Sequence, residues 1–172
     1  EGVDTGAVFL TRKTVIEGSD TAQTLTRRLA ALGAELLIET LKWIERGTLT
    51  AVAQVGSASY APPIGKNDFR IDWSRPAADI VNLIRGLYPG AFTLINGQRI
   101  KILRGRVCPD ITLNGNHRPC DIVGKDHNGL LIAALDGLVS IEELQPEGKR
   151  PMSFRDYLSG RVNAREGLVN VG

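Results

Sequence analysis

The chain has 172 residues, 42% hydrophobic and 23% charged, and a formal net charge of +2. This composition is typical of a folded globular protein and excludes a low-complexity or strongly charged disordered chain. Cys108 and Cys120 are too few for a disulfide scaffold, so we expect two free thiols.

No apolar run is long enough to cross a bilayer, and the first residues have no signal-peptide pattern. We therefore expect a cytoplasmic protein without a membrane partner. The histidines, His117 and His127, both lie in polar loops, and no group of ligand residues has the spacing of a zinc centre. We expect no metal site.

The sequence pattern of residues 1–54 predicts a strand followed by a long helix. Apolar runs at 8–10 and 14–16 indicate a β segment, and Ser19-Asp20-Thr21 offers N-cap side chains for the helix. Gly47 is suited to end it. The broad apolar stripe predicts that the helix covers a sheet, as the last part of an α/β layer. This stripe consists of Leu25, Leu29, Leu32, Leu36, Leu37, Leu41 and Ile44.

Residues 55–70 are rich in glycine and proline and predict a linker between domains. A second helix should start near Ser74, with Pro76 in its first turn, where a missing N–H costs nothing. Its apolar face is formed by Ile80, Leu83, Ile84 and Leu87.

Beyond Gly90 the hydrophobic period changes to two, which indicates strands. Asn96-Gly97 between two alternating runs is a strong hairpin signal. Further strands are predicted at 121–124, 130–134 and 138–144, and Ser153-x-x-Asp156 predicts a short final helix that ends at Gly160. Five short strands favour a small barrel, with the oligonucleotide-binding type as one candidate.

Four groups of motifs occur in order over nearly the whole chain, at a spacing that is hard to obtain by chance. They are Val3-Asp4-Thr5-Gly6; Tyr60-Ala61-Pro62 with Ile71-Asp72-Trp73-Ser74; Ile95-Asn96-Gly97-Gln98; and Leu144-Gln145-Pro146-Glu147-Gly148-Lys149. Together they resemble the C-terminal part of the methionyl-tRNA formyltransferase family, within the folate-dependent formyltransferase superfamily.

The resemblance implies a fold of the α/β + β class in three parts. Residues 1–54 would be the strand–helix end of a truncated, Rossmann-like catalytic domain, 55–70 a linker, and 71–172 an oligonucleotide-binding-like β-barrel domain with flanking helices. It also implies an activity: transfer of a formyl group from the co-substrate 10-formyltetrahydrofolate to the α-amine of initiator methionyl-tRNA, in translation initiation.

The resemblance makes Asp4 the catalytic residue and places Val3, Asp4 and Thr5 at the folate. In the family the aspartate orients a histidine, which together with a side-chain amide stabilises the oxyanion that forms when the amine attacks. Neither His117 nor His127 lies in the family's histidine motif. We therefore expect the chain as given to lack the Asn/His half of the site and to be inactive alone.

Residues 55–172 hold 15 Lys and Arg against 12 Asp and Glu, so the basic surplus lies in the second part. Basic residues alternate with apolar ones after the hairpin turn and could face phosphates, although a solvated strand face would have the same pattern. The expected tRNA-binding residues are Arg85, Arg99, Lys101, Arg104, Arg106, Lys149 and Arg150.

Two departures from the family pattern concern substrate identity. Pro63 stands where the family usually has lysine, and Pro119-Cys120 where it commonly has Pro-Gly. Two alternatives therefore stay open. One is another formyltransferase of the superfamily, acting on an amino sugar nucleotide or a carrier-bound amino acid. The other is a non-catalytic nucleic-acid-binding barrel fragment.

Overall fold

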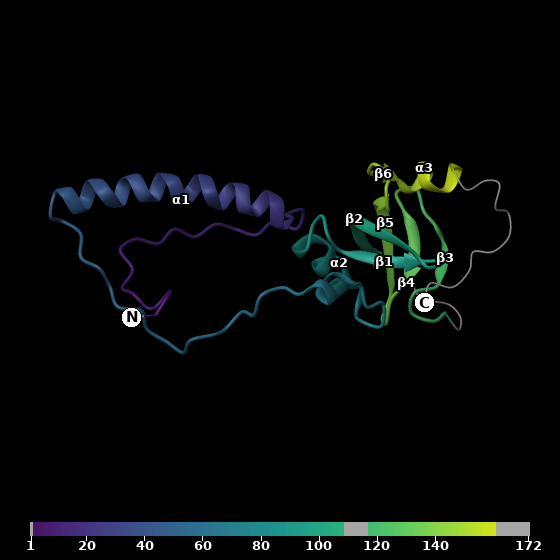
Figure 1. Cartoon of the computed structure of the whole chain (residues 1–172), viewed down its shortest axis with the longest axis horizontal. Helices are drawn as coiled ribbons and strands as arrows, with labels where there is room; N and C mark the ends of the chain where they lie inside the picture. Colours follow the sequence, from purple (N-terminus) through teal and green to yellow (C-terminus); the bar gives the residue numbers. More distant parts are fainter. Residues whose placement is uncertain (1, 109–116, 161–172) are drawn as a thin grey trace. The chain divides into compact units, whose positions relative to one another are not determined.

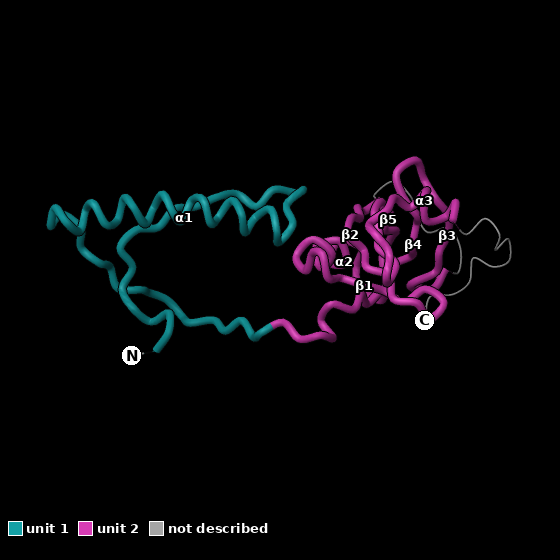
Figure 2. Tube along the Cα trace, turned by 45° about the horizontal axis from the view of Figure 1, so that its top comes forward, with its two compact units in different colours: residues 1–63 teal, residues 64–172 magenta. Residues whose placement is uncertain are grey.

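The structure is a computed structural model that describes residues 2–108 and 117–160. The chain divides into two compact units, Glu1–Pro63 (unit 1) and Ile64–Gly172 (unit 2), which Figure 2 shows in different colours.

Helix α1 spans Ala22–Glu45 in unit 1, and its ends follow the capping signals of the sequence. The Thr21 hydroxyl accepts a hydrogen bond from the Thr24 N–H at 3.3 Å, and the Thr24 hydroxyl accepts one from the Thr21 N–H at 2.9 Å. Gly47 has φ 65° and donates its N–H to the Ile44 carbonyl. This left-handed conformation suits glycine. The predicted helix and its end at Gly47 are confirmed.

The β segment predicted at residues 8–10 and 14–16 is wrong. Only Val8 pairs, through two backbone hydrogen bonds of 2.8 and 2.9 Å with Val52. A strand needs a neighbour for its backbone N–H and C=O groups. The described residues of unit 1 supply that neighbour only at Val52, so they form an isolated bridge and no strand.

The segment before α1 instead runs extended along the helix, as Figure 1 shows in purple, and polar contacts hold it there. Arg12 reaches Glu39 at 2.7 Å. Arg28 of α1 donates to the Val15 carbonyl and forms an ion pair with Asp20. The hydrogen bonds from Arg28 hold the pKa of Asp20 well below its usual range. No residue of α1 is buried, so the prediction that α1 covers a sheet does not hold within unit 1.

Unit 2 contains one sheet in which every pair of neighbouring strands is antiparallel. Its strands are β1 Phe92–Ile95, β2 Gln98–Cys108, β3 Ile122–Lys125, β4 Leu130–Ala133, β5 Leu138–Pro146 and β6 Met152–Ser153. The order is β1-β2-β5-β4-β3, and β6 pairs with β5. The first five strands were predicted, whereas β6 was not, because two residues are too few for a periodic pattern.

The hairpin between β1 and β2 forms at the predicted turn. Asn96 has φ 52° and Gly97 φ 73°. Positive φ at both central residues is the requirement of a type I′ turn, whose twist matches that of the two strands. The turn fixes the register that pairs Thr93 with Ile100.

Helix α2 spans Ala77–Gly86 and follows a short 3-10 helix, η1, at Lys66–Phe69. Pro76 is the N-cap, one position before the first turn in which it was expected, and offers no side-chain acceptor. The acceptor comes from the β4–β5 turn, where Asp136 Oδ1 binds the Ala77 N–H at 2.8 Å. This hydrogen bond gives one N–H at the start of α2 an acceptor and links α2 to the sheet.

The core of unit 2 lies between α2, the sheet and helix α3, which spans Phe154–Ser159. Ile84 of α2 and Ile141 of β5 are fully buried in it, and Phe154 and Tyr157 contribute from α3. Ser153 caps α3 by accepting from the Asp156 N–H at 3.2 Å, as the sequence predicts. Figure 1 shows α3 directly after β6 at one end of the sheet.

No helix among the described residues combines the length and the apolar character that a bilayer crossing requires. No three or more His, Cys, Asp or Glu side chains in that part of the chain lie close enough together to hold a metal ion.

Candidate functional sites

Strand β2 carries four of the predicted phosphate-binding residues, and a β-bulge keeps them on one face. Side chains of a regular strand alternate between its faces, so Lys101 and Arg104 would point in opposite directions. The register against β5 shifts between Ile102 and Arg104, and Leu103 is buried like Ile102. The extra residue therefore turns Arg104 outward. As a result, Arg99, Lys101, Arg104 and Arg106 are all exposed or half-buried.

Arg104 and Arg106 already have acidic partners. Glu142 of β5 lies 4.0 Å from the Nε of Arg104 and 3.4 Å from the Nε of Arg106. Arg106 also donates to Asp126. Burial opposes ionisation of Asp126, but the N–H groups of Asn128 and Gly129 outweigh it and lower its pKa. These two arginines therefore present less net charge than their sequence pattern suggests.

Arg99 and Lys101 line a cavity of about 340 Å³ with the end of β5 and the following turn, Gln145–Gly148. The guanidinium carbon of Arg99 lies 3.9 Å from the centre of the Phe92 ring, a cation–π contact that orients it. The Gln145 amide donates to the Lys149 carbonyl at 2.8 Å.

The turn held by Gln145 also carries Arg150. Within the described residues, no carboxylate forms an ion pair with Arg99, Lys101, Lys149 or Arg150. This end of the β2 face therefore has more uncompensated positive charge than the end with Arg104 and Arg106.

Arg85 occupies a different place. It lies in the last turn of α2, half-buried, and donates to Asn82 Oδ1. It does not line the cavity of Arg99 and Lys101. The structure thus brings Arg99, Lys101 and the turn of Lys149 together and leaves Arg85 on a separate element.

The loop of Asp4 in unit 1 is exposed, and its backbone is held from a distance in sequence. Asp4 has φ 63°, a conformation that aspartate tolerates better than most residues. The Gln54 amide donates to the carbonyl of Asp4 at 3.0 Å and to that of Gly6 at 2.8 Å. The Thr5 hydroxyl donates to the Gly2 carbonyl at 2.8 Å. Sequence reasoning missed Gln54, since nothing local relates it to residues 4–6.

This arrangement leaves the Asp4 side chain available. No hydrogen bond or ion pair to its carboxylate is found among the described residues, and Val3 and Thr5 on either side are also exposed. Residues 1–63 contain no histidine, and His117 and His127 belong to unit 2. A carboxylate of this kind can accept a hydrogen bond from a donor side chain and thereby orient it. Unit 1 contains no histidine that could be this donor.

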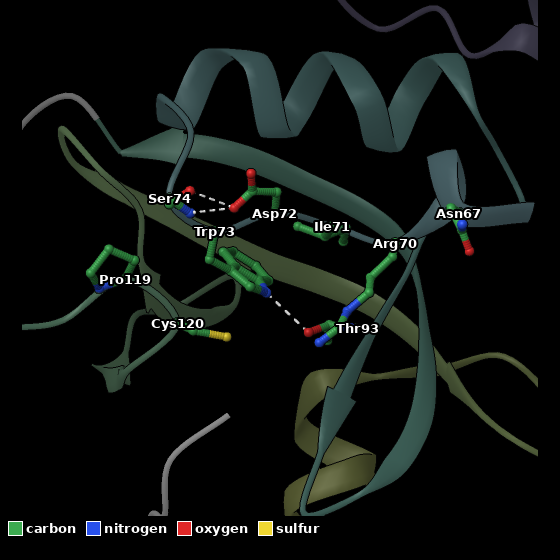
Figure 3. A pocket seen from close by; sticks show the side chains of 9 residues that line it. All are labelled: Asn67, Arg70, Ile71, Asp72, Trp73, Ser74, Thr93, Pro119 and Cys120. Atoms are coloured by element: carbon green, nitrogen blue, oxygen red, sulfur yellow. Dashed lines mark hydrogen bonds between the residues drawn. The ribbon is translucent and has the colours of Figure 1, made fainter. Parts of the chain in front are cut away.

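A second cavity of unit 2, about 450 Å³, lies beside Trp73. Figure 3 shows the Trp73 indole N–H directed at the Thr93 hydroxyl, at 3.0 Å, and the Cys120 thiol extending toward the same space. Trp73 is 5% exposed, so it belongs to the core and is no stacking platform. Burial raises the pKa of Cys120 to about 12, which keeps it a neutral thiol. Both cysteines are free and buried.

Comparisons with known proteins bear on both sites. Residues 63–162 match the family model described as formyl transferase, C-terminal domain. The methionyl-tRNA formyltransferase of Thermodesulfovibrio yellowstonii is 39% identical over 163 residues, which are 94% of this chain and 51% of that protein. The enzyme of Caldanaerobacter subterraneus is 41% identical over 98% of this chain and 54% of that protein.

Solved structures agree at the level of the fold. Aquifex aeolicus HypX in complex with tetrahydrofolic acid is similar with a TM-score of 0.65 at 18% identity, over 92% of this chain and 28% of that one. A variant of the same protein reaches a TM-score of 0.69 at 17% identity.

The match to the family model covers more than half of the chain and includes α2, the whole described sheet and α3. The chain spans about half the length of the curated relatives that it matches. The antiparallel sheet with its helices is consistent with such a C-terminal domain. The chain belongs to the formyl transferase C-terminal domain family.

Proposed function

We propose that this chain serves a cytoplasmic methionyl-tRNA formyltransferase, which transfers a formyl group from 10-formyltetrahydrofolate to the α-amine of initiator methionyl-tRNA. In this proposal unit 2 holds the tRNA and unit 1 supplies an active-site aspartate. The observation that carries it is the identity of about 40% to enzymes of this name, over 93% or more of the chain.

Asp4 is proposed to act by orientation. When the amine attacks the formyl carbon, negative charge develops on the formyl oxygen and must be met by aimed donors. A carboxylate that accepts from a histidine fixes its tautomer and stabilises its protonated form. The exposed carboxylate of Asp4, on a backbone held by Gln54, suits this role. The exposed residues Val3 and Thr5 are available to contact the folate.

Unit 2 is proposed to bind the RNA backbone through the β2 face. Arg99, Lys101, Lys149 and Arg150 have no carboxylate partner among the described residues, so phosphates can replace their counterions. Arg104 and Arg106 contribute less because Glu142 and Asp126 compensate them. Arg85 would extend the contact from α2. The curved sheet would then act as a barrel of the oligonucleotide-binding type.

The catalytic part is tested with a chimera that joins the part of the Thermodesulfovibrio relative outside the alignment to residues 1–172. We expect the chimera to formylate methionyl-tRNA with 10-formyltetrahydrofolate, and Asp4→Asn to lower kcat by about 10²–10⁴-fold. Residues 1–172 alone should give no turnover above the rate without protein. A folded chimera that is inactive, or an active Asp4→Asn variant, would contradict the proposal.

The RNA-binding part is tested with residues 1–172 and fluorescently labelled initiator tRNA, by anisotropy between about 50 and 200 mM salt. Arg99→Gln with Lys101→Gln should weaken binding and reduce the salt slope by about 1.4–1.8, the value for two lost phosphate contacts. Arg104→Gln with Arg106→Gln removes the same charge and should have a smaller effect. Affinity that does not change with salt would refute the electrostatic contact.

A further inference from the structure

A second basic cavity of unit 2 lies outside the predicted RNA-binding residues. It measures about 490 Å³ and is formed between the β3–β4 turn and helix α3. Its polar lining includes Lys125, His127, Arg155 and Ser159, all exposed, beside the half-buried Leu158. The basic side chains thus come from two elements separated in sequence.

The β3–β4 turn is held by several contacts, so the backbone at Lys125 and His127 has a defined position. Asp126 Oδ1 accepts the N–H groups of Asn128 at 2.7 Å and Gly129 at 2.6 Å. A Cβ on Gly129 would collide with the Ser140 hydroxyl and the Ile141 carbonyl, so the turn needs glycine to pack against β5.

The acidic residue that lines this cavity, Asp126, and the acidic residue beside it in sequence on α3, Asp156, are both already engaged. Asp126 forms an ion pair with Arg106 through Oδ2, in addition to its bonds to the turn. Asp156, next to Arg155 on α3, accepts from the Ser153 hydroxyl at 2.8 Å. Neither acid forms an ion pair with Lys125 or Arg155 among the described residues.

Arg155 also has a defined position. Its guanidinium donates to the His127 carbonyl at 2.6 Å, which links α3 to the turn. A guanidinium has five N–H donors, so this single bond leaves others for an acceptor in the cavity. The cavity therefore combines a preorganised arginine, a flexible lysine and an imidazole around a space open to an anion.

The two basic cavities are close enough for one nucleic-acid strand. Gly148 lines the first cavity, and Phe154 lines the second. Six residues can span at most about 22 Å when fully extended. This corresponds to roughly six nucleotide steps at about 3.4 Å of axial rise per strand.

We infer that Lys125, His127 and Arg155 form a second phosphodiester-binding site, which contacts the same RNA backbone as Arg99 and Lys101. This inference rests on the proposed function, since the ligand is the tRNA. It assigns RNA contact to the β3–β4 turn and α3, which carry none of the predicted RNA-binding residues. A tRNA bound at both cavities makes more phosphate contacts than the β2 face provides alone.

The test uses residues 1–172 and labelled initiator tRNA, with affinity measured by anisotropy between about 50 and 200 mM salt. Lys125→Gln with Arg155→Gln removes the charges and keeps polar, shorter side chains. We expect several-fold weaker binding and a salt slope smaller by about 1.4–1.8. Arg27→Gln with Lys42→Gln on α1 is the charge-matched control, and Lys125→Arg with Arg155→Lys should retain wild-type binding.

The outcomes separate the two proposals. If the wild-type chain shows no salt-dependent binding of tRNA, the proposed function of unit 2 fails. If the wild type binds but Lys125→Gln with Arg155→Gln has the same slope as the α1 control, the second site is refuted. Circular dichroism and thermal unfolding of each variant verify the fold. Should Arg155→Gln unfold α3, Lys125→Gln alone still must reduce the slope by about 0.7–0.9.

Discussion

The two units differ in what their amphipathic helices contact. Helix α2 buries Ile80 and Ile84 against the sheet, and Ile84 is fully buried. Helix α1 is more than twice as long and has a broader apolar stripe, yet no residue in it is buried, and Leu37 is 59% exposed. Both sequences have helical periodicity, but only α2 has a sheet of its own unit to cover.

Helical periodicity in a sequence therefore specifies a helix but not the surface against which that helix packs. The extended segment beside α1 holds it through charged groups, Arg12 with Glu39 and Arg28 with Asp20. Ion pairs near a protein surface contribute little to stability because water and salt screen them, whereas burial of a large apolar side chain contributes about 1.5–3 kcal/mol. Unit 1 should therefore be much less stable than unit 2.

The largest expected effect is in hydrogen exchange. Amides of residues 22–45 should exchange at least about 10²-fold faster than those of β2 and β5, because opening α1 exposes little apolar surface that is not already exposed. Mass spectrometry of a monomer verified by light scattering measures this. Strong, uniform protection of the α1 amides in that monomer would show that unit 1 is not less stable than unit 2.

The next largest difference between the units is expected when a large apolar side chain is replaced by alanine. Ile141→Ala should lower the free energy of unfolding of unit 2 by about 2–5 kcal/mol, because Ile141 is fully buried and the cavity left behind cannot close completely. Leu37→Ala on α1 should change the free energy of unfolding of unit 1 by no more than about 0.5 kcal/mol.

Each unit has its own tryptophan for this experiment, Trp43 in α1 and Trp73 in unit 2. Urea unfolding of Ile141→Ala is followed by Trp73 fluorescence in a Trp43→Phe background. For Leu37→Ala, Trp43 is followed in a Trp73→Phe background. Equal losses in the two units would show that α1 is packed as tightly as α2.

A smaller effect is expected at the helix cap that unit 2 takes from its sheet. Asp136→Ala should destabilise unit 2 by about 0.5–2 kcal/mol, because the Ala77 N–H loses its acceptor. Asp136→Asn keeps a side-chain oxygen there and should retain most of the stability. If Asp136→Asn is as damaging as Asp136→Ala in urea unfolding, the carboxylate charge and not the cap is responsible.

The smallest effect is the pH dependence of the Asp20 contact in unit 1. Arg28 lowers the pKa of Asp20 in the folded state. The contact therefore stabilises unit 1 fully above the ordinary pKa of aspartate, about 3.9. Its contribution is lost as the pH falls from there through the lowered value.

This prediction is measured as the far-ultraviolet circular dichroism of the wild type minus that of Asp20→Asn. The wild type should have more helix at pH 7, and the difference should disappear in strong acid. A difference that persists at pH 1 would exclude the ion pair as its cause.

Much of unit 2 followed from its sequence, because the signals there are local. Asn96-Gly97 specifies a type I′ turn wherever it lies between alternating runs, and Ser153 with Asp156 caps a helix three residues away. In unit 1, Thr21 and Gly47 delimit α1 for the same reason. The family motifs likewise identified Asp4 as a candidate site residue, and the alternation of basic with apolar residues identified the charges of β2.

Apart from the two-residue strand β6, the main features that the sequence did not predict join residues that are distant in the chain. Gln54 holds the Asp4 loop across 50 positions, and Asp136 caps α2 across 59. Cys120 has φ 83°, a backbone conformation that favours glycine, and its thiol is buried in the core. The strand expected at residues 8–10 does not form, because a strand needs a pairing partner and only Val8 finds one, at Val52. The local sequence does not show whether such a partner exists.

The sequence by itself determined where the helices and most strands of this protein begin and end, and which residues carry charge, because caps, turns and periodicity act over a few residues. Tertiary structure decided which charges are available. The bulge at Leu103 sets the direction of the Arg104 side chain. Glu142 and Asp126 then compensate the charges of Arg104 and Arg106 through ion pairs. Such compensation depends on distances across strands, and these distances exist only once the sheet has formed.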